Sequence, residues 1–199
     1  MKINWQDNES VKKIIESCIK GDLMSQQTLY KAFYGKMLVV CMRYAKDKDE
    51  ALDILQDGFV KVFEKLKNFE FKGSLEGWIR RIMVNTAIDN IRKRKDVFTK
   101  TDPELELELD SIADEEMNDD ELEKIKSLKA EIIIKLIQQL SPAYRTVFNM
   151  FVIENMTHAE IAERLNINIG TSKSNLAKAK IKLRQLVNEY IKTYHHEIF

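Results

Sequence analysis

Apolar residues recur every three or four positions along most of this chain, which is the spacing of one face of an α-helix. A clear example is the stripe formed by Val11, Ile14, Ile15, Cys18 and Ile19. Only 6 glycines and 2 prolines occur among the 199 residues, which leaves few sites for the tight turns of a strand-rich fold. We therefore expect an all-α fold, and a chain of this length holds one medium domain or two small ones.

Charge divides the chain into three segments, although the whole chain balances 32 basic against 32 acidic residues. Residues 72–95 carry seven basic and two acidic side chains, residues 96–124 carry two basic and thirteen acidic ones, and residues 129–199 carry ten basic and six acidic ones. The acidic stretch has no apolar stripe over its first half, so it cannot bury enough surface to offset the entropy of ordering. We predict two small helical domains, 1–95 and 121–199, joined by a flexible acidic linker, 96–120.

Four helices are expected in the first domain. The first is expected to end near Gly21, the second to begin near Ser25 and the third to begin near Asp49. The fourth is expected to run from about Leu75 to Lys95. The third helix has a polar face, opposite its apolar stripe, made of Asp53, Gln56, Asp57, Lys61 and Glu64. By spacing alone, this is a solvated face.

The loop before the fourth helix combines aromatic residues, glycines and a basic helix end. Phe69, Phe71 and Trp78 precede or open the helix, which closes on the basic run 92–95. Bases stack on rings while cations follow phosphates, so this composition suits single-stranded nucleic acid. A second interpretation also fits, in which the rings are core and the basic run interacts with the helix C-terminus.

The second domain has the local signals of a helix-turn-helix. Ser141 and Pro142 suit the start of one helix, and residues 157–160, Thr-His-Ala-Glu, form a capping box. Asn166 suits a left-handed turn and Asn168 suits the cap of the last helix. That helix is expected to direct polar residues outward: Thr171, Ser172, Lys173, Ser174, Asn175, Lys178, Lys180 and Lys182. A short capped helix, a tight turn and such a second helix are typical of major-groove binding.

Together, these segments resemble the extracytoplasmic-function subclass of the sigma-70 family over nearly the whole chain. The similarity is carried by DEALDILQDGFVKVF, by WIRRIMVNTAIDNIRKRK, and by LSPAYRTVF with THAEIAERLNINIGTSKSNLAKAKIKL. The resemblance implies a transcription initiation factor that binds core RNA polymerase, directs it to promoters through minus-thirty-five and minus-ten elements, and assists DNA melting.

The resemblance also implies a role for particular residues. Docking on the clamp helices of the largest polymerase subunit is implied for Asp53, Gln56, Asp57 and Phe59. Contact with minus-ten DNA is implied for Phe71, Lys72, Gly73, Ser74, Trp78, Arg81, Asn85 and Arg92. Contact with minus-thirty-five DNA, from a domain that packs on the flap of the second-largest subunit, is implied for Thr171, Ser172, Lys173, Asn175, Lys178 and Lys180.

Enzyme chemistry is not expected from this sequence. It has no glycine-rich phosphate loop, no nucleophile with its base and no metal cluster, and its three histidines have no candidate partners, so we expect no cofactor and no metal. Cys18 and Cys41 are interpreted as core residues in a reducing compartment. A polar N-terminus and the absence of a run of about 18 apolar residues predict a cytoplasmic protein without membrane insertion.

Two other functions are alternatives to this interpretation. One is a helix-turn-helix transcriptional regulator, although the first domain lacks the alternating strands of a ligand-binding or phosphoacceptor domain. The other is a helical protein-binding adaptor, which leaves the polar last helix unexplained. Whether an anti-sigma factor also binds the chain stays open.

Overall fold

The regular structure in the described part of the chain is helical, and no strand occurs there. The computed structural model describes residues 4–5, 7–94, 97–98 and 128–198. Two compact units are present, Met1–Asn90 and Ile91–Phe199. The expected all-α fold is confirmed. The predicted linker, 96–120, lies outside the described residues except for 97 and 98, so its limits and flexibility stay a prediction.

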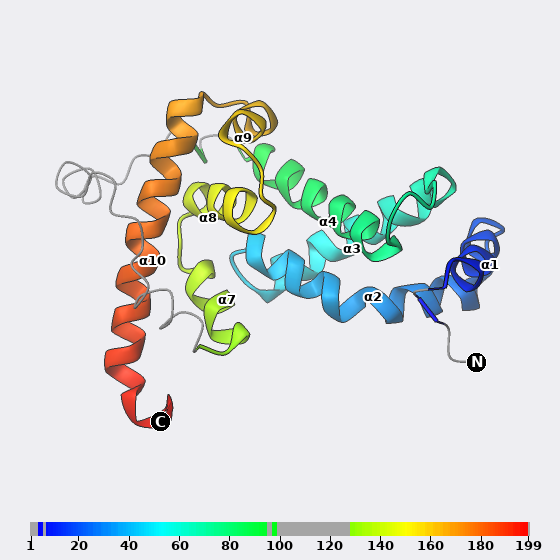
Figure 1. Ribbon diagram of the computed structural model, residues 1–199, viewed down its shortest axis with the longest axis horizontal. Coiled ribbons are helices and arrows are strands. Elements are labelled where there is room, and N and C mark those ends of the chain that lie inside the picture. The colour runs from blue at the N-terminus through cyan, green and yellow to red at the C-terminus, as the bar shows by residue number, and fades with distance from the viewer. Residues whose placement is uncertain (1–3, 6, 95–96, 99–127, 199) are drawn as a thin grey trace. The chain divides into compact units, whose positions relative to one another are not determined.

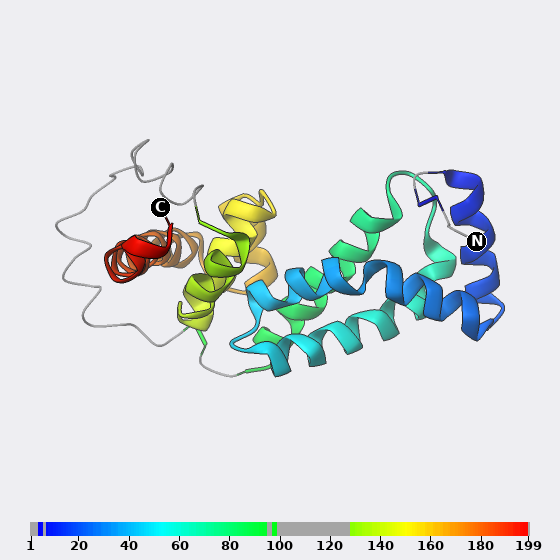
Figure 2. The same ribbon diagram turned by 90° about the horizontal axis from the view of Figure 1, so that it is seen from below.

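The first unit contains the four expected helices (Figure 1). They are α1 (Asn8–Ile19), α2 (Leu23–Tyr44), α3 (Lys48–Lys65) and α4 (Leu75–Arg92), with a 3₁₀ turn, η1 (Leu66–Asn68), after α3. Figures 1 and 2 show α2, α3 and α4 running side by side, while α1 packs across the end at which α2 begins. The fourth helix ends at Arg92, before the expected end at Lys95.

Aspartates fix the starts of the first three helices. Each side chain accepts a hydrogen bond from the backbone N–H three residues later: Asp7 from Ser10 (2.9 Å), Asp22 from Ser25 (2.8 Å) and Asp47 from Glu50 (2.9 Å). Such caps each stabilise a helix by about 0.5–2 kcal/mol. The position at which each of these helices begins is therefore determined by residues within its own first turn.

A small residue lets α3 approach α4 closely. Gly58 is buried in α3, and a Cβ at this position would collide with the Sδ of Met83, a buried residue of α4. The cysteines are buried in the same unit, as expected, and burial raises the pKa of the Cys18 thiol to about 11 and that of the Cys41 thiol to about 12. Both thiols therefore behave as apolar core groups.

The second unit is built on one long helix. Its elements are α7 (Ala130–Gln138), α8 (Pro142–Phe148), a π-helical turn, η2 (Asn149–Ile153), α9 (His158–Leu165) and α10 (Ile169–Ile198). The three shorter helices lie along one side of α10 (Figure 1). The core between them is apolar and includes Val147, Met150, Ile161, Leu165, Leu176, Ala179 and Leu183.

Candidate nucleic-acid interface

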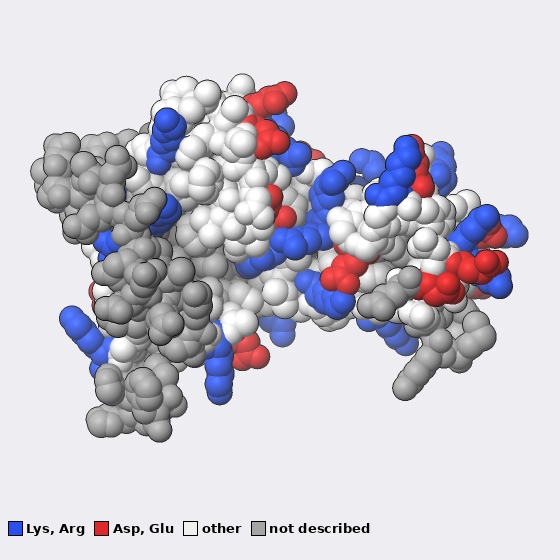
Figure 3. Space-filling view, in the orientation of Figure 1, with Lys and Arg blue, Asp and Glu red and all other residues white. Residues whose placement is uncertain are grey.

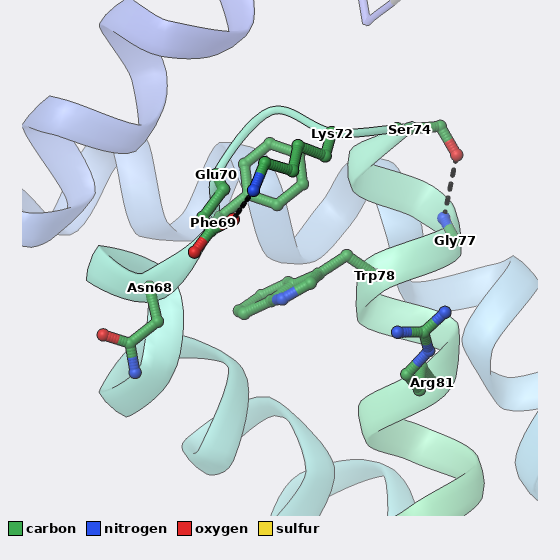
Figure 4. Close-up of a pocket in the computed structure, with 9 residues that line it drawn as sticks. Asn68, Phe69, Glu70, Lys72, Ser74, Gly77, Trp78 and Arg81 are labelled. Atoms are coloured by element: carbon green, nitrogen blue, oxygen red, sulfur yellow. Dashed lines mark hydrogen bonds and ion pairs between the residues drawn. The ribbon is translucent and has the colours of Figure 1, made fainter.

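A pocket lies in the first unit, between η1, the loop 69–74 and the start of α4. It has a volume of about 470 Å³ and is lined by Asn68, Phe69, Glu70, Lys72, Gly73, Ser74, Gly77, Trp78 and Arg81 (Figure 4). The Trp78 ring lies 5.6 Å from that of Phe69, at 59° between planes. Trp78 is half-buried, so part of its ring is accessible for stacking.

Backbone geometry shapes the loop of this pocket. Phe71 adopts a positive φ of 58°, and Gly73 has a φ of 139°, a conformation that L side chains rarely adopt. The Phe71 ring packs 4.8 Å from Phe69, which holds the loop against the core. Ser74 then accepts a hydrogen bond from the Gly77 N–H at 3.1 Å and so starts α4. The loop therefore has a defined shape.

The pocket brings together most, but not all, of the residues assigned to minus-ten DNA. Lys72, Gly73, Ser74, Trp78 and Arg81 line it. Phe71 does not line it, because its ring faces Phe69 instead.

The other assigned residues lie outside the pocket. Asn85 and Arg92 are exposed further along α4. Sequence reasoning missed the contributions of Asn68 and Glu70, whose only signal was their position beside the loop.

The charged groups around the pocket are of both signs. Arg81 is exposed on α4, and the Nζ of Lys72 lies 2.7 Å from an oxygen of Glu70. Figure 3 shows basic and acidic side chains close together over this unit, without a single large basic patch on the face in view. On the face in view, contact with nucleic acid would therefore depend on individual basic side chains and not on one broad basic patch.

The polar face of α3 lies exposed, as expected, at Asp53, Gln56 and Asp57. Phe59 was expected to take part in docking, and this is wrong: only 3% of it is exposed, and its ring lies 4.6 Å from that of Tyr30 in the core. Helical spacing places Phe59 on the side of α3 that packs on α2. Val60, 53% exposed, lies one turn beyond Gln56 and Asp57 instead, and sequence reasoning missed it.

The helix-turn-helix signals are confirmed in the second unit. Thr157 and Glu160 form the capping box, and Asn166 adopts the left-handed conformation at φ 55°. The Oδ1 of Asn168 accepts a hydrogen bond from the N–H of Thr171 at 2.6 Å, which caps α10. The turn between α9 and α10 is therefore fixed by the left-handed backbone of Asn166 at one end and by the side chain of Asn168 at the other.

The outward face of α10 differs from the expected one. Lys173 is exposed, and Thr171 and Lys180 are half-exposed. The expectation that Ser172, Asn175 and Lys178 point outward is wrong, because they are 0%, 9% and 5% exposed.

Helical spacing accounts for two of these three residues. Ser172 and Asn175 share the side of α10 that carries Leu176 and Ala179, which packs on α8 and α9. Lys178 lies three residues from both Asn175 and Ile181, which are buried too.

His158 has partners that the sequence did not reveal. Its Nδ1 lies 2.9 Å from the Ser172 Oγ, and its ring stacks on Phe151 at 4.5 Å. Burial lowers the pKa of His158, and the charges of Lys173 and Lys180 lower it further. The prediction that this histidine lacks a partner is therefore wrong, although its role is to join α9 to α10.

Neither a metal centre nor a membrane-spanning helix occurs in the described ranges. Across residues 4–5, 7–94, 97–98 and 128–198, no three His, Cys, Asp or Glu side chains are grouped so that they could hold a metal ion. Within the same part of the chain, no helix combines the length and the apolar character that crossing a membrane requires.

Known proteins share both units. Residues 29–97 match Sigma-70 region 2, and residues 130–183 match Sigma-70, region 4. The ECF RNA polymerase sigma factor SigW of Bacillus subtilis is 27% identical over 90% of this chain and 97% of its own length. The RNA polymerase sigma-H factor of Pseudomonas aeruginosa is 26% identical over 86% of this chain and 91% of its own length.

A solved structure is also similar. It is the sigma factor RpoE of Bartonella quintana in complex with the anti-sigma factor NepR. The match covers 81% of this chain and 96% of the matched chain, at 20% identity and with a TM-score of 0.46. The matched segments 29–97 and 130–183 contain the pocket of the first unit and the helix-turn-helix of the second.

Proposed function

The chain belongs to the extracytoplasmic-function group of the sigma-70 family, and from this membership we propose which of its surfaces meet the polymerase and the promoter. The protein is a promoter-directing transcription initiation factor and not an enzyme. The alternatives, a one-component regulator and a helical adaptor, are not favoured. We place its activity in the cytoplasm, with core RNA polymerase and promoter DNA as its partners.

We propose that the pocket of the first unit holds an unstacked base of the melted minus-ten strand. The observation that carries this is the cavity of about 470 Å³ beside the Trp78 ring. A pocket with an accessible ring repays part of the unstacking energy by stacking, which contributes about 1–3 kcal/mol per base. Arg81 at the pocket, and Asn85 and Arg92 further along the exposed side of α4, would follow the backbone of the displaced strand.

We propose that the exposed face of α3 docks on the clamp helices of the largest polymerase subunit. Asp53, Gln56 and Asp57 supply polar groups, and Val60 supplies an exposed apolar group beside them. Protein interfaces commonly combine apolar and polar groups in this way. Phe59 supports this face from beneath through its contact with Tyr30.

We propose that the second unit reads the minus-thirty-five duplex through α10 and packs on the flap of the second-largest subunit. Lys173, with the half-exposed Thr171 and Lys180, is accessible on this helix. The lysines would contact phosphates, which fix the position of the helix in the groove. The fixed turn between α9 and α10 supports this docking, because it holds the second helix at a set angle.

A pair of charge-reversal variants tests the docking proposal. The double variant Asp53→Lys/Asp57→Lys should no longer compete with the wild-type protein for core polymerase. Its helical content should stay unchanged, because substitutions at exposed positions usually lower the free energy of unfolding by less than about 0.5 kcal/mol. Glu9→Lys with Glu16→Lys makes the same change of charge on exposed positions of α1 and should compete normally. Normal competition by the Asp53/Asp57 variant would place the docking face elsewhere.

The pocket proposal is tested by Trp78→Ala in the polymerase complex. This variant should still bind core polymerase but should open promoters poorly, as read by permanganate reactivity of unpaired thymines. Unchanged reactivity would show that the pocket does not contribute to melting.

A further inference from the structure

The side chains around the pocket differ in what they offer to a base. Lys72 and Arg81 only donate hydrogen bonds, Asn68 can donate and accept, and the Ser74 hydroxyl already accepts the N–H of Gly77. Glu70 has the one carboxylate among the lining residues, and a carboxylate only accepts. An acid is unexpected in a site for DNA, because it repels phosphates and so weakens binding.

The position of Glu70 suits contact with the edge of a bound base. Figure 4 shows its side chain and that of Lys72 on the loop side of the Trp78 ring, and an oxygen of Glu70 lies 2.7 Å from the Lys72 Nζ. Both side chains are largely exposed, and ion pairs in water contribute little to stability, so a base edge can join or displace this pair. The pair presents an acceptor beside a donor.

We propose that Glu70 makes the pocket selective for a base that carries an exocyclic amino group, and that it discriminates against thymine. The amino groups of adenine, cytosine and guanine can each donate to the carboxylate, while Lys72 donates to an adjacent ring nitrogen or carbonyl oxygen. Thymine has no amino group, and its two carbonyl oxygens flank its single N–H, so they face the carboxylate unfavourably. This inference rests on the proposed capture of an unstacked base by the pocket.

A binding selection tests the proposal and does not require a known promoter sequence. The complex of the full chain with core polymerase is incubated with single-stranded DNA that contains a randomised segment, and the bound strands are sequenced. In the wild-type pool, one position should show thymine depleted by about tenfold, the effect of one well-placed contact to a base edge. Glu70→Ala should remove this depletion.

Glu76→Ala is the matched control. It removes the same charge from a carboxylate close by on α4, but Glu76 pairs with Lys36 and does not line the pocket. This variant should keep the depletion of thymine. Equal binding of core polymerase and equal helical content would show that all variants are folded.

Analogues then test the amino group itself. Strands that carry adenine, cytosine or guanine at the selected position are compared with strands that carry purine, 2-pyrimidinone or hypoxanthine, which lack only that group. Removing it from the accepted base should weaken wild-type binding about tenfold and should change the binding of Glu70→Ala little.

Two patterns of results separate this inference from the function on which it rests. If Trp78→Ala weakens strand binding while Glu70→Ala leaves every preference unchanged, the inference fails and base capture stands. If the wild-type pool shows no base preference, and Trp78→Ala or an abasic site changes nothing, base capture fails and the inference with it.

Discussion

The Nδ1 of His158 lies 2.9 Å from the Oγ of Ser172, and this contact joins the first helix of the helix-turn-helix to the second. Ser172 is fully buried, so its hydroxyl has no contact with solvent. The face of the imidazole stacks on the Phe151 ring, at an interplanar angle of 25°. The angle between α9 and α10 therefore depends on a polar contact as well as on apolar packing.

The surroundings of His158 make the stability of the second unit sensitive to pH. Burial and the charges of Lys173 and Lys180 lower the pKa of His158 in the folded state, whereas the unfolded value is about 6.5. Below that value the unfolded chain binds the proton more readily, so the stabilisation by neutral His158 is present at higher pH and is lost as the pH falls. The free energy of unfolding should therefore drop more steeply below pH of about 6.5 in wild type than in His158→Gln. A steeper drop in the variant would contradict this.

The close approach of α3 and α4 predicts that Gly58→Ala destabilises the first unit by about 1–3 kcal/mol, because the new methyl group overlaps the side chain of Met83. Urea denaturation measures this cost. Shortening the partner in Gly58→Ala/Met83→Val should recover part of it, so the two substitutions should not be additive. Additive costs would mean that the two residues do not meet.

The loop of the pocket gives a second glycine prediction. Gly73→Ala places a Cβ at a φ of 139°, which should strain the loop by about 1–3 kcal/mol and weaken binding of single-stranded DNA. Gly35→Ala is the control, because Gly35 lies within α2 with open space around its Cα, and alanine there should stabilise the helix by about 0.5–1 kcal/mol. Equal effects of the two substitutions on strand binding would contradict a defined loop shape.

The observed face of α10 changes the expected roles of its polar residues. Lys173→Ala should weaken all duplexes about equally and reduce the slope of affinity against salt by about one, as for a single phosphate contact. Asn175→Ala should lower the free energy of unfolding and leave sequence preference unchanged, because the side chain is buried. A relaxed sequence preference in Asn175→Ala would instead show that Asn175 contacts the DNA bases.

The sequence predicted those features that depend on neighbouring residues. Thr157 with Glu160, and Asn166 with Asn168, form a cap and a turn within a few residues, so their pattern alone identifies the helix-turn-helix. The orientation of Ser172 could not be predicted in this way. A polar residue is expected to face water, and only the contact with His158, fourteen residues earlier, shows that it does not.

The pocket shows the same division between local and tertiary signals. Trp78 and the loop glycine could be assigned from composition, since rings and glycines are informative residue types. Glu70 could not, because a single exposed acid is common on any surface and gains meaning only from its position beside Trp78. Phe59 was assigned to docking by family resemblance, whereas its helical spacing alone places it on the buried, apolar side of α3.

Transcription with purified components tests the central claim most directly. Core polymerase is incubated with genomic fragments of the source bacterium, with and without this protein, and the 5′ ends of the transcripts are sequenced. The account predicts new start sites that require the protein and share two upstream sequence elements at a constant spacing. Transcripts whose start sites are the same with and without the protein would contradict it.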